Sequence, residues 1–356
     1  MAQDHDPPSQ SLASSSKLPS QALPYLCRES GRDALSDVLR GVKLTGAVFH
    51  LVEASRPWGV ELPAAERYAP IILPGAQHIV SYHIVLEGNG WAVVPGLAPL
   101  PFEAGDILVL ARGKPYALLS APTQAPEYTA EATLGFFRDW MAGKLPFVTR
   151  EGGGQPGGAR YVCGFLGCDL LPFNPVLAAL PPLLRVKRAA GDGLLDRLLD
   201  LTLAEADLPR AGGESIRLRL SELVFIEVLR QYLESLPAHE TGWLAGLRDP
   251  AVGRALTALH DDPARAWSLN DLAAEAGLSR AALAARFAHL VGHPPMQYLT
   301  LWRLQIAARR LADSGAKVAA VGREVGYASE AAFSRAFKKT VGLSPAAWRK
   351  KAAGDH

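Results

Sequence analysis

Residues 321–342 have the sequence VGREVGYASEAAFSRAFKKTVG, and an earlier stretch of the chain repeats their pattern. Residues 272–277, LAAEAG, match VGREVG at 321–326, and residues 287–292, FAHLVG, match FKKTVG at the end of the stretch. In each copy a short apolar-periodic helix ends at a glycine, a tight turn follows, and a serine caps a second helix. The chain therefore contains a predicted helix-turn-helix unit twice.

The second helix of each unit has one apolar face, and that face predicts how the helix is held. Leu283 and Phe287 fall on one side of the first copy, as Phe333 and Phe337 do in the second. A helix packed on one side leaves its other side free to enter the major groove of DNA. The residues expected to contact DNA are Ser279, Arg280, Ala281, Ala284, Ala285, Arg286, Glu330, Ala331, Ser334, Arg335 and Lys338.

A continuous helical pattern at residues 296–312 separates the two units. Such a helix is about 25 Å long and stiff. It is suited to hold two recognition helices near the spacing of one DNA turn, about 34 Å.

The C-terminal region resembles the DNA-binding domain of the AraC/XylS transcription regulators, over residues 254 to 351. The motifs that carry the resemblance are VGREVGY at 321–327, FSRAFKK at 333–339 and GLSP at 342–345. The resemblance implies a DNA-binding domain at about 250–351, with helix-turn-helix units at about 268–290 and 317–340. It also implies double-stranded DNA as partner and RNA polymerase as a further candidate partner.

The charge distribution agrees with a DNA-binding C-terminal region. Residues 250–356 contain 15 Lys and Arg against 8 Asp and Glu, a charge of +7, although the whole chain has a net charge of only +2. A basic domain on an acidic body suits binding to a phosphate backbone at one end of the molecule. The absence of a long apolar run or of a signal-peptide pattern predicts a cytoplasmic protein without a membrane partner.

The N-terminal half has a different, β-rich pattern. Residues 1–30 are rich in Ser, Pro and Gln and predict a flexible extension. Short apolar runs between residues 44 and 119 predict the strands of a sandwich or barrel, with a hairpin at Gly88-Asn89-Gly90. The segments 82–88, YHIVLEG, and 101–107, PFEAGDI, resemble the cupin sensor domain of AraC-type regulators. We therefore assign residues 31–190 to a cupin-like sensor domain.

Cupin resemblance raises the question of a metal site. His83 and Glu87 are four residues apart and would share one face of an extended strand. His78 would point to the other face, and Tyr116 stands where the family pattern often has a further His. Because the ligand set is incomplete, we expect no metal and no other cofactor, and we place a small-molecule effector near His83, Glu87 and Tyr116.

The region after residue 121 contains a glycine-rich stretch and two cysteines. Residues 152–158, GGGQPGG, predict a flexible surface loop. Cys163 and Cys168 leave a redox-responsive regulator as an alternative function. An odd separation along a strand would, however, place the two thiols on opposite faces, and the three cysteines of the chain argue against a disulfide scaffold.

Two strongly apolar helical patterns occupy residues 191–237. They predict a helical pair that packs on the sensor domain or on a second subunit, and we expect it to form a homodimer. Residues 238–249 are the expected linker to the DNA-binding domain.

These patterns predict an α+β multidomain fold with an N-terminal cupin-like β-barrel, a helical pair and an all-α double helix-turn-helix domain. The expected function is sequence-specific transcription regulation in response to an unknown small molecule or stress. A cupin enzyme with a DNA-binding appendage is the remaining alternative. The incomplete set of metal ligands argues against an enzyme, so we expect no catalytic residues.

Overall fold

A computed structural model describes residues 33–41, 44–168, 173–187, 193–207, 210–237 and 240–354. The predicted extension at residues 1–30 lies outside the described residues. No helix within these ranges is long and apolar enough to cross a membrane.

The N-terminal half is built on one curled sheet of nine strands, with the order β2-β6-β3-β8-β1-β7. Off this path, β4 and β5 pair with β3, and β9 pairs with β5. Pairing is antiparallel except between β1 and β7. The strands are β1 (Leu44–Arg56), β2 (Gly59–Leu62), β3 (His78–Val93), β4 (Leu100–Glu103), β5 (Asp106–Leu110), β6 (Tyr116–Leu119), β7 (Val148–Gly152), β8 (Gln155–Cys168) and β9 (Leu184–Lys187).

The predicted hairpin at residues 88–90 is wrong. β3 continues through this segment, and its residues 89–92 pair with β4. Gly88 has a φ of 77°, and a Cβ there would lie 2.0 Å from the carbonyl oxygen of Gly158 on the neighbouring strand. The glycines thus allow close strand packing, and the chain reverses only after Val93.

The glycine-rich stretch is also ordered differently from the prediction. Residues 155–158 form the start of β8, beside β1. A Cβ at Gly158 would lie 1.7 Å from the carbonyl oxygen of Ala54. Glycine is needed here for the close approach of two backbones.

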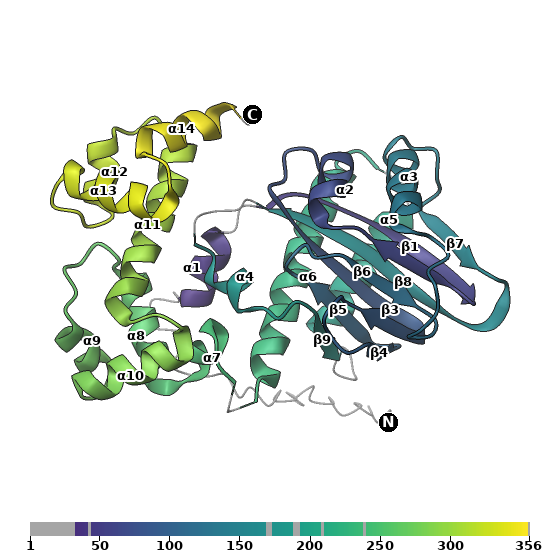
Figure 1. Ribbon diagram of the computed structural model, residues 1–356, viewed down its shortest axis with the longest axis horizontal. Coiled ribbons are helices and arrows are strands. Elements are labelled where there is room, and N and C mark those ends of the chain that lie inside the picture. The colour runs from purple at the N-terminus through teal and green to yellow at the C-terminus, as the bar shows by residue number, and fades with distance from the viewer. Residues whose placement is uncertain are drawn as a thin grey trace, which may run out of the picture.

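Helices cover both faces of the sheet (Figure 1). One face, with Phe49 and Tyr82, packs on α6, while the other, with Trp58 and Tyr161, packs on α2 and α3. The helices of this half are α1 (Ala34–Gly41), α2 (Ala65–Ile72), α3 (Ala130–Met141), α4 (Pro175–Ala179), α5 (Leu194–Asp207) and α6 (Gly213–Ser235).

The C-terminal half is entirely helical. Its long helix α11 joins two small helix groups, as Figure 1 shows. The helices are α7 (Trp243–Arg248), α8 (Pro250–Asp261), α9 (Leu269–Ala276), α10 (Arg280–Val291), α11 (Pro295–Asp313), α12 (Val318–Glu324), α13 (Glu330–Val341) and α14 (Pro345–Gly354). Half of the expected linker is therefore helix α7, which buries Trp243 and Leu247 against this domain.

The two halves share a continuous apolar core. Helix α1 packs against α8 and α11 of the DNA-binding half, and α4 packs against α7. The backbone N–H of Phe173 donates to the side-chain oxygen of Gln305 on α11 at 2.9 Å. The Phe173 ring lies 5.6 Å from that of Tyr298, measured between ring centroids. The N-terminal half thus rests directly on the helix that carries both helix-turn-helix units.

Candidate nucleic-acid interface and sensor cavity

Local hydrogen bonds fix the first helix-turn-helix unit, formed by α9 and α10. Ser268 and Asp271 form a capping box at the start of α9. Gly277 ends that helix with a φ of 66°, a left-handed conformation that glycine adopts without strain. The Ser279 hydroxyl then accepts from the backbone N–H of Ala282 at 3.2 Å and begins α10. The predicted glycine stop and serine cap are both confirmed.

The second unit, formed by α12 and α13, uses the same devices. The Ser329 hydroxyl accepts from the backbone N–H of Ala332 at 3.2 Å, and Gly326 has a φ of 89° in the turn. Phe333 and Phe337 are fully buried under α13, with ring centroids 5.6 Å apart. These contacts leave the opposite side of α13 facing solvent.

The two recognition helices, α10 and α13, present different chemistry to solvent. On α10, Ala281 and Ala285 are exposed, whereas Ala284 is half-buried, so this face offers mainly methyl groups. On α13, Arg335 and Lys338 are exposed and have no ion-pair partner among the described residues. A free guanidinium on a recognition helix can bond a guanine edge, and methyl groups can contact thymine.

Arg286 does not have the free side chain that the sequence pattern suggested. Its guanidinium Nε lies 2.8 Å from the Asp249 carboxylate. That carboxylate also accepts from the first backbone N–H groups of α8, and its side chain is only 10% exposed. Arg286 therefore ties α10 to α8, and its contact with DNA remains a prediction.

Further basic side chains lie near the second unit and were not predicted from the sequence as DNA contacts. Lys317, Arg323 and Lys339 are exposed, with no hydrogen-bond or ion-pair partner in the part of the chain that the structure describes. Arg303 instead donates to the carbonyl oxygens of Pro263 and Arg265, at 2.6 and 2.8 Å, and so supports the turn before α9. In the sequence, charge alone did not distinguish the three free cations from Arg303, which donates to the backbone.

The proposed effector residues do not form one site. His83 is buried, and its Nε2 lies 2.7 Å from the Tyr116 hydroxyl. Glu87, by contrast, is 70% exposed and pairs with Arg160 at 3.4 Å. A register shift between Val85 and Glu87 breaks the simple alternation that would have placed both side chains on one face. The expectation that His83 and Glu87 share a face is wrong.

The two cysteines lie on opposite faces of β8, as the odd separation predicted. Cys163 Sγ is 3.0 Å from His83 Nδ1, across the strands β8 and β3. Burial raises the pKa of the Cys163 thiol and lowers the pKa of His83 to about 3. Both groups are therefore neutral near pH 7, and a reactive thiolate is disfavoured.

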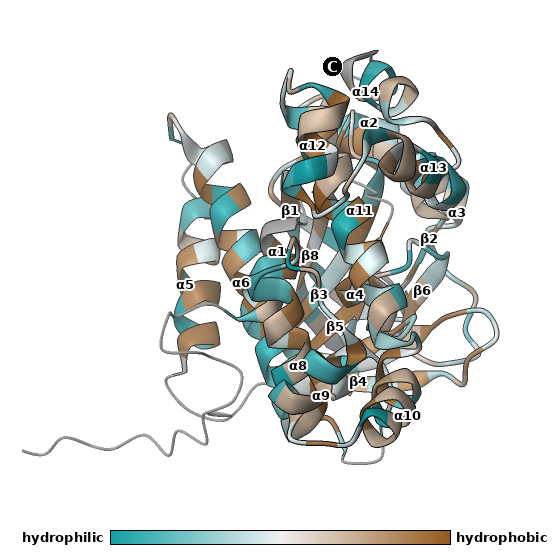
Figure 2. Cartoon of the chain, turned by 90° about the vertical axis from the view of Figure 1, so that its left-hand side faces the viewer, coloured by the Kyte–Doolittle hydropathy of each residue, from teal (hydrophilic) through white to brown (hydrophobic). Residues whose placement is uncertain are grey.

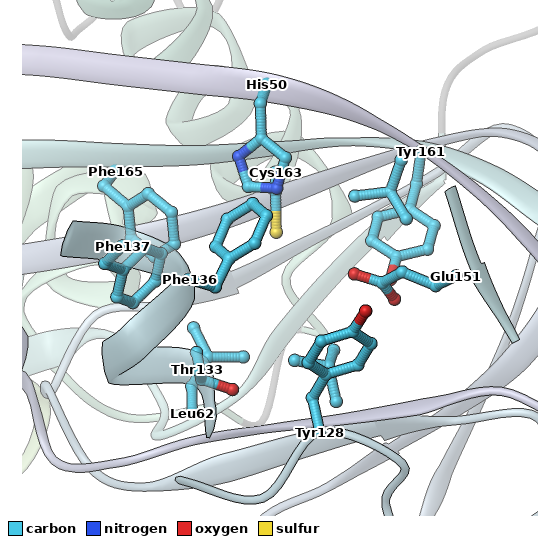
Figure 3. Close-up of a pocket in the computed structure, with 12 residues that line it drawn as sticks. His50, Leu62, Tyr128, Thr133, Phe136, Phe137, Glu151, Tyr161, Cys163 and Phe165 are labelled. Carbon is cyan, nitrogen blue, oxygen red and sulfur yellow. The ribbon is translucent and has the colours of Figure 1, made fainter. Parts of the chain in front are cut away.

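A separate cavity lies between the sheet and α3 (Figure 3). Its free volume is small, about 20 Å³, which is room for roughly one water molecule. The residues that line it are His50, Val52, Val60, Leu62, Tyr128, Thr133, Phe136, Phe137, Glu151, Tyr161, Cys163 and Phe165. Only Cys163 was among the site residues expected from the sequence. Within the described ranges, no three His, Cys, Asp or Glu side chains are grouped as metal ligands.

Two helix-turn-helix units at the ends of one long helix define a DNA-binding protein. Comparison with known proteins gives the family. A cupin family model matches residues 33–234, and a helix-turn-helix domain model matches residues 272–351.

A putative AraC-like transcription regulator of Streptomyces lividans is 35% identical over 89% of this chain and 98% of its own length. The HTH-type transcriptional regulator AlkR of Acinetobacter baylyi is 26% identical over 90% of this chain and 99% of its own. The DNA-binding domain of AdpA, solved in complex with a target DNA, is 32% identical over 30% of this chain and 95% of its own, with a TM-score of 0.28. The chain belongs to the AraC-type transcription regulators, and the predicted family and fold class are confirmed.

Proposed function

We propose that this regulator binds a specific operator as a homodimer and that a small molecule in the N-terminal half controls the binding. The observation that carries the DNA-binding part is the pair of capped recognition helices, whose outer faces are free of packing. Arg335 on α13 reads a base edge, and Lys338 binds phosphate. Helix α10 contributes contacts to thymine methyls and to DNA shape, with Arg280 on a phosphate.

The helical pair α5 and α6 is the proposed dimer interface. The two helices pack against each other at the side of the molecule, with apolar turns along their length (Figure 2). Leu194 and Leu201 on α5 are 54% and 57% exposed, and Ile216 and Leu223 on α6 are also exposed. Each pair is seven residues apart, so it forms a stripe on its helix. Apolar stripes of this kind favour burial against a second copy.

An effector would act through the contacts between the two halves. It shifts the protein only by binding two arrangements of these halves with different affinity. Helix α1 and Phe173 contact the DNA-binding half directly and are the elements through which such a shift would pass. A regulator of chromosomal DNA acts in the cytoplasm, where RNA polymerase is the partner that it would recruit or exclude. In this proposal the protein has no enzymatic activity.

The test begins with selection of bound fragments from genomic DNA by the purified full-length protein. The sequence found is then used in competition against scrambled DNA, with the Arg335→Ala variant and with Lys114→Ala as a control. Lys114 is an exposed cation of the sensor half. We expect Arg335→Ala alone to lose preference for the selected sequence. Failure of the wild-type protein to select any common sequence would contradict the proposal.

A further inference from the structure

We propose that the cavity between the sheet and α3, together with the larger cleft in front of it, binds a small organic amine with an apolar body, and that Glu151 holds the ammonium group. This rests on the proposed effector control, and it moves the effector site from the His83 region to residues that come from β1, β7, β8 and α3.

The polar groups gather at one end of the cavity. Figure 3 shows the Glu151 carboxylate beside the hydroxyls of Tyr161 and Tyr128. One carboxylate oxygen of Glu151 and the Tyr161 hydroxyl are shielded from solvent and have no hydrogen-bond partner within the described chain. Buried polar atoms are normally paired, so unpaired ones that face a cavity indicate a missing donor. An ammonium group supplies up to three such donors.

Above about pH 7 the charge at this end of the cavity is negative, because Glu151 is then ionised. None of the lining residues of the cavity is a Lys or Arg. Burial, and then the neighbouring carboxylate of Glu127, raise the pKa of Glu151 to about 7. The carboxylate thus lacks a compensating cation in the described structure, and a ligand that carries a positive charge would supply one. An anionic ligand would be repelled by the Glu151 carboxylate and is disfavoured.

The rest of the cavity is apolar and aromatic. Phe136, Phe137 and Phe165 form the walls opposite Glu151. The His50 ring lies 4.7 Å from that of Trp140, measured between centroids, and burial lowers the pKa of His50 to about 3. His50 is therefore neutral and adds no repulsion to a cation. Aromatic faces also attract an ammonium group directly. The walls select a ligand with an aryl or short alkyl body.

A larger cleft leads to this cavity. It shares Tyr128, Phe136 and Glu151 with the inner cavity. The other residues that line it are Leu145, Pro146, Val148, Thr149 and Arg150. The cleft has a free volume of about 480 Å³, which suits a small organic molecule, whereas the inner cavity has only about 20 Å³. The ammonium group would therefore enter the inner cavity, and the apolar body would lie in the cleft. Phe136 is only half-buried, so its ring can move when a ligand enters. The carboxylate thus lies where the cleft meets the inner cavity.

Isothermal titration calorimetry tests the proposal with three probes of similar shape: phenethylamine, 2-phenylethanol and phenylacetate. The full-length protein is used without DNA at pH 8, where Glu151 is ionised and the amine is protonated. We expect phenethylamine to bind, 2-phenylethanol to bind roughly tenfold or more weakly, since it cannot form a charge-assisted hydrogen bond, and phenylacetate not to bind.

Glu151→Gln should lose the preference for the amine, whereas Glu66→Gln, a change at an exposed carboxylate on α2, should keep it. Circular dichroism verifies that both variants fold, and Phe136→Ala provides a second variant that should weaken the binding of the amine and of the alcohol alike. The proposal is overturned if the alcohol or the acid binds as tightly as the amine, or if Glu151→Gln binds the amine unchanged. It is also overturned if no primary amine of about four to ten carbon atoms, the size range that suits a pocket for a small ligand, binds. Because these titrations contain no DNA, each of these results leaves operator binding untouched.

Discussion

Glu151→Gln should stabilise the protein at pH 8 and leave its stability almost unchanged at pH 4. Burial raises the pKa of Glu151 from 4.5 to about 7, so the folded state holds a proton that the unfolded state has released. Folding stability therefore falls as pH rises from 4.5 to 7. Above pH 7 the buried charge lowers the free energy of unfolding by the full amount that corresponds to the pKa difference between the folded and unfolded states. At 1.36 kcal/mol per pKa unit, that cost is about 3 kcal/mol. The neutral amide of Gln removes it.

Differential scanning calorimetry of the full-length protein measures this effect, with Glu66→Gln as control. For a domain of this size, about 3 kcal/mol corresponds to roughly 6 to 12 °C in the melting temperature of the N-terminal half at pH 8. The gain should shrink as pH falls through 7 towards 4.5. An equal gain at every pH would mean that Gln only packs better. No gain at any pH would mean that Glu151 is well solvated, and either result would refute the reasoning.

Four further outcomes follow from the structure. Arg335→Ala should lose about 1–3 kcal/mol of discrimination between the operator and scrambled DNA in competition binding; an equal loss on both DNAs would make Arg335 a phosphate contact. Arg280→Ala should reduce the salt slope of operator binding by about one unit, and an unchanged slope would remove it from the interface. Leu223→Glu should shift the protein from dimer to monomer in sedimentation analysis, because it places a charge in the apolar stripe of α6; a dimer that persists would locate the interface elsewhere. Cys163→Ser and Cys168→Ser should each leave effector-dependent DNA binding intact, since both thiols are buried; loss of an oxidant response in either variant would restore the redox alternative.

The DNA-binding half was predictable because its signals are local. A glycine stop, a serine cap and an apolar face with a period of 3.6 residues all lie within one helix-turn-helix unit. Ser279, Ser329 and Gly277 therefore have the roles that the sequence indicated. The sequence could not show which cations are ion-paired. Arg286, for example, pairs with Asp249, which is 37 residues away.

The N-terminal half was less predictable because pairing between distant strands decides its details. The segment at residues 88–90 has the local pattern of a turn, yet β4 and β8 hold it inside a strand. Helix α3 was missed, although Thr129 caps it and Leu134 and Phe137 share its buried face. Its pattern is short and interrupted by Gly135, so the signal was weak without the sheet against which the helix packs.

The proposed amine cavity shows most clearly that a site formed by pairing between distant strands cannot be predicted from local sequence patterns. His50, Glu151 and Tyr161 come from β1, β7 and β8, and they meet only because β1 lies between the other two strands. Successive side chains of β8 point to opposite faces of the sheet, so this strand connects the cavity with the core on the other face. Tyr161 faces the cavity, and its neighbour Val162 belongs to the opposite core, against which α6 packs. A ligand that moves the Tyr161 ring would therefore press on the strand that α6 covers. The same core extends without a break to Trp302 on α11, so a change at β8 can reach the helix that holds both recognition helices.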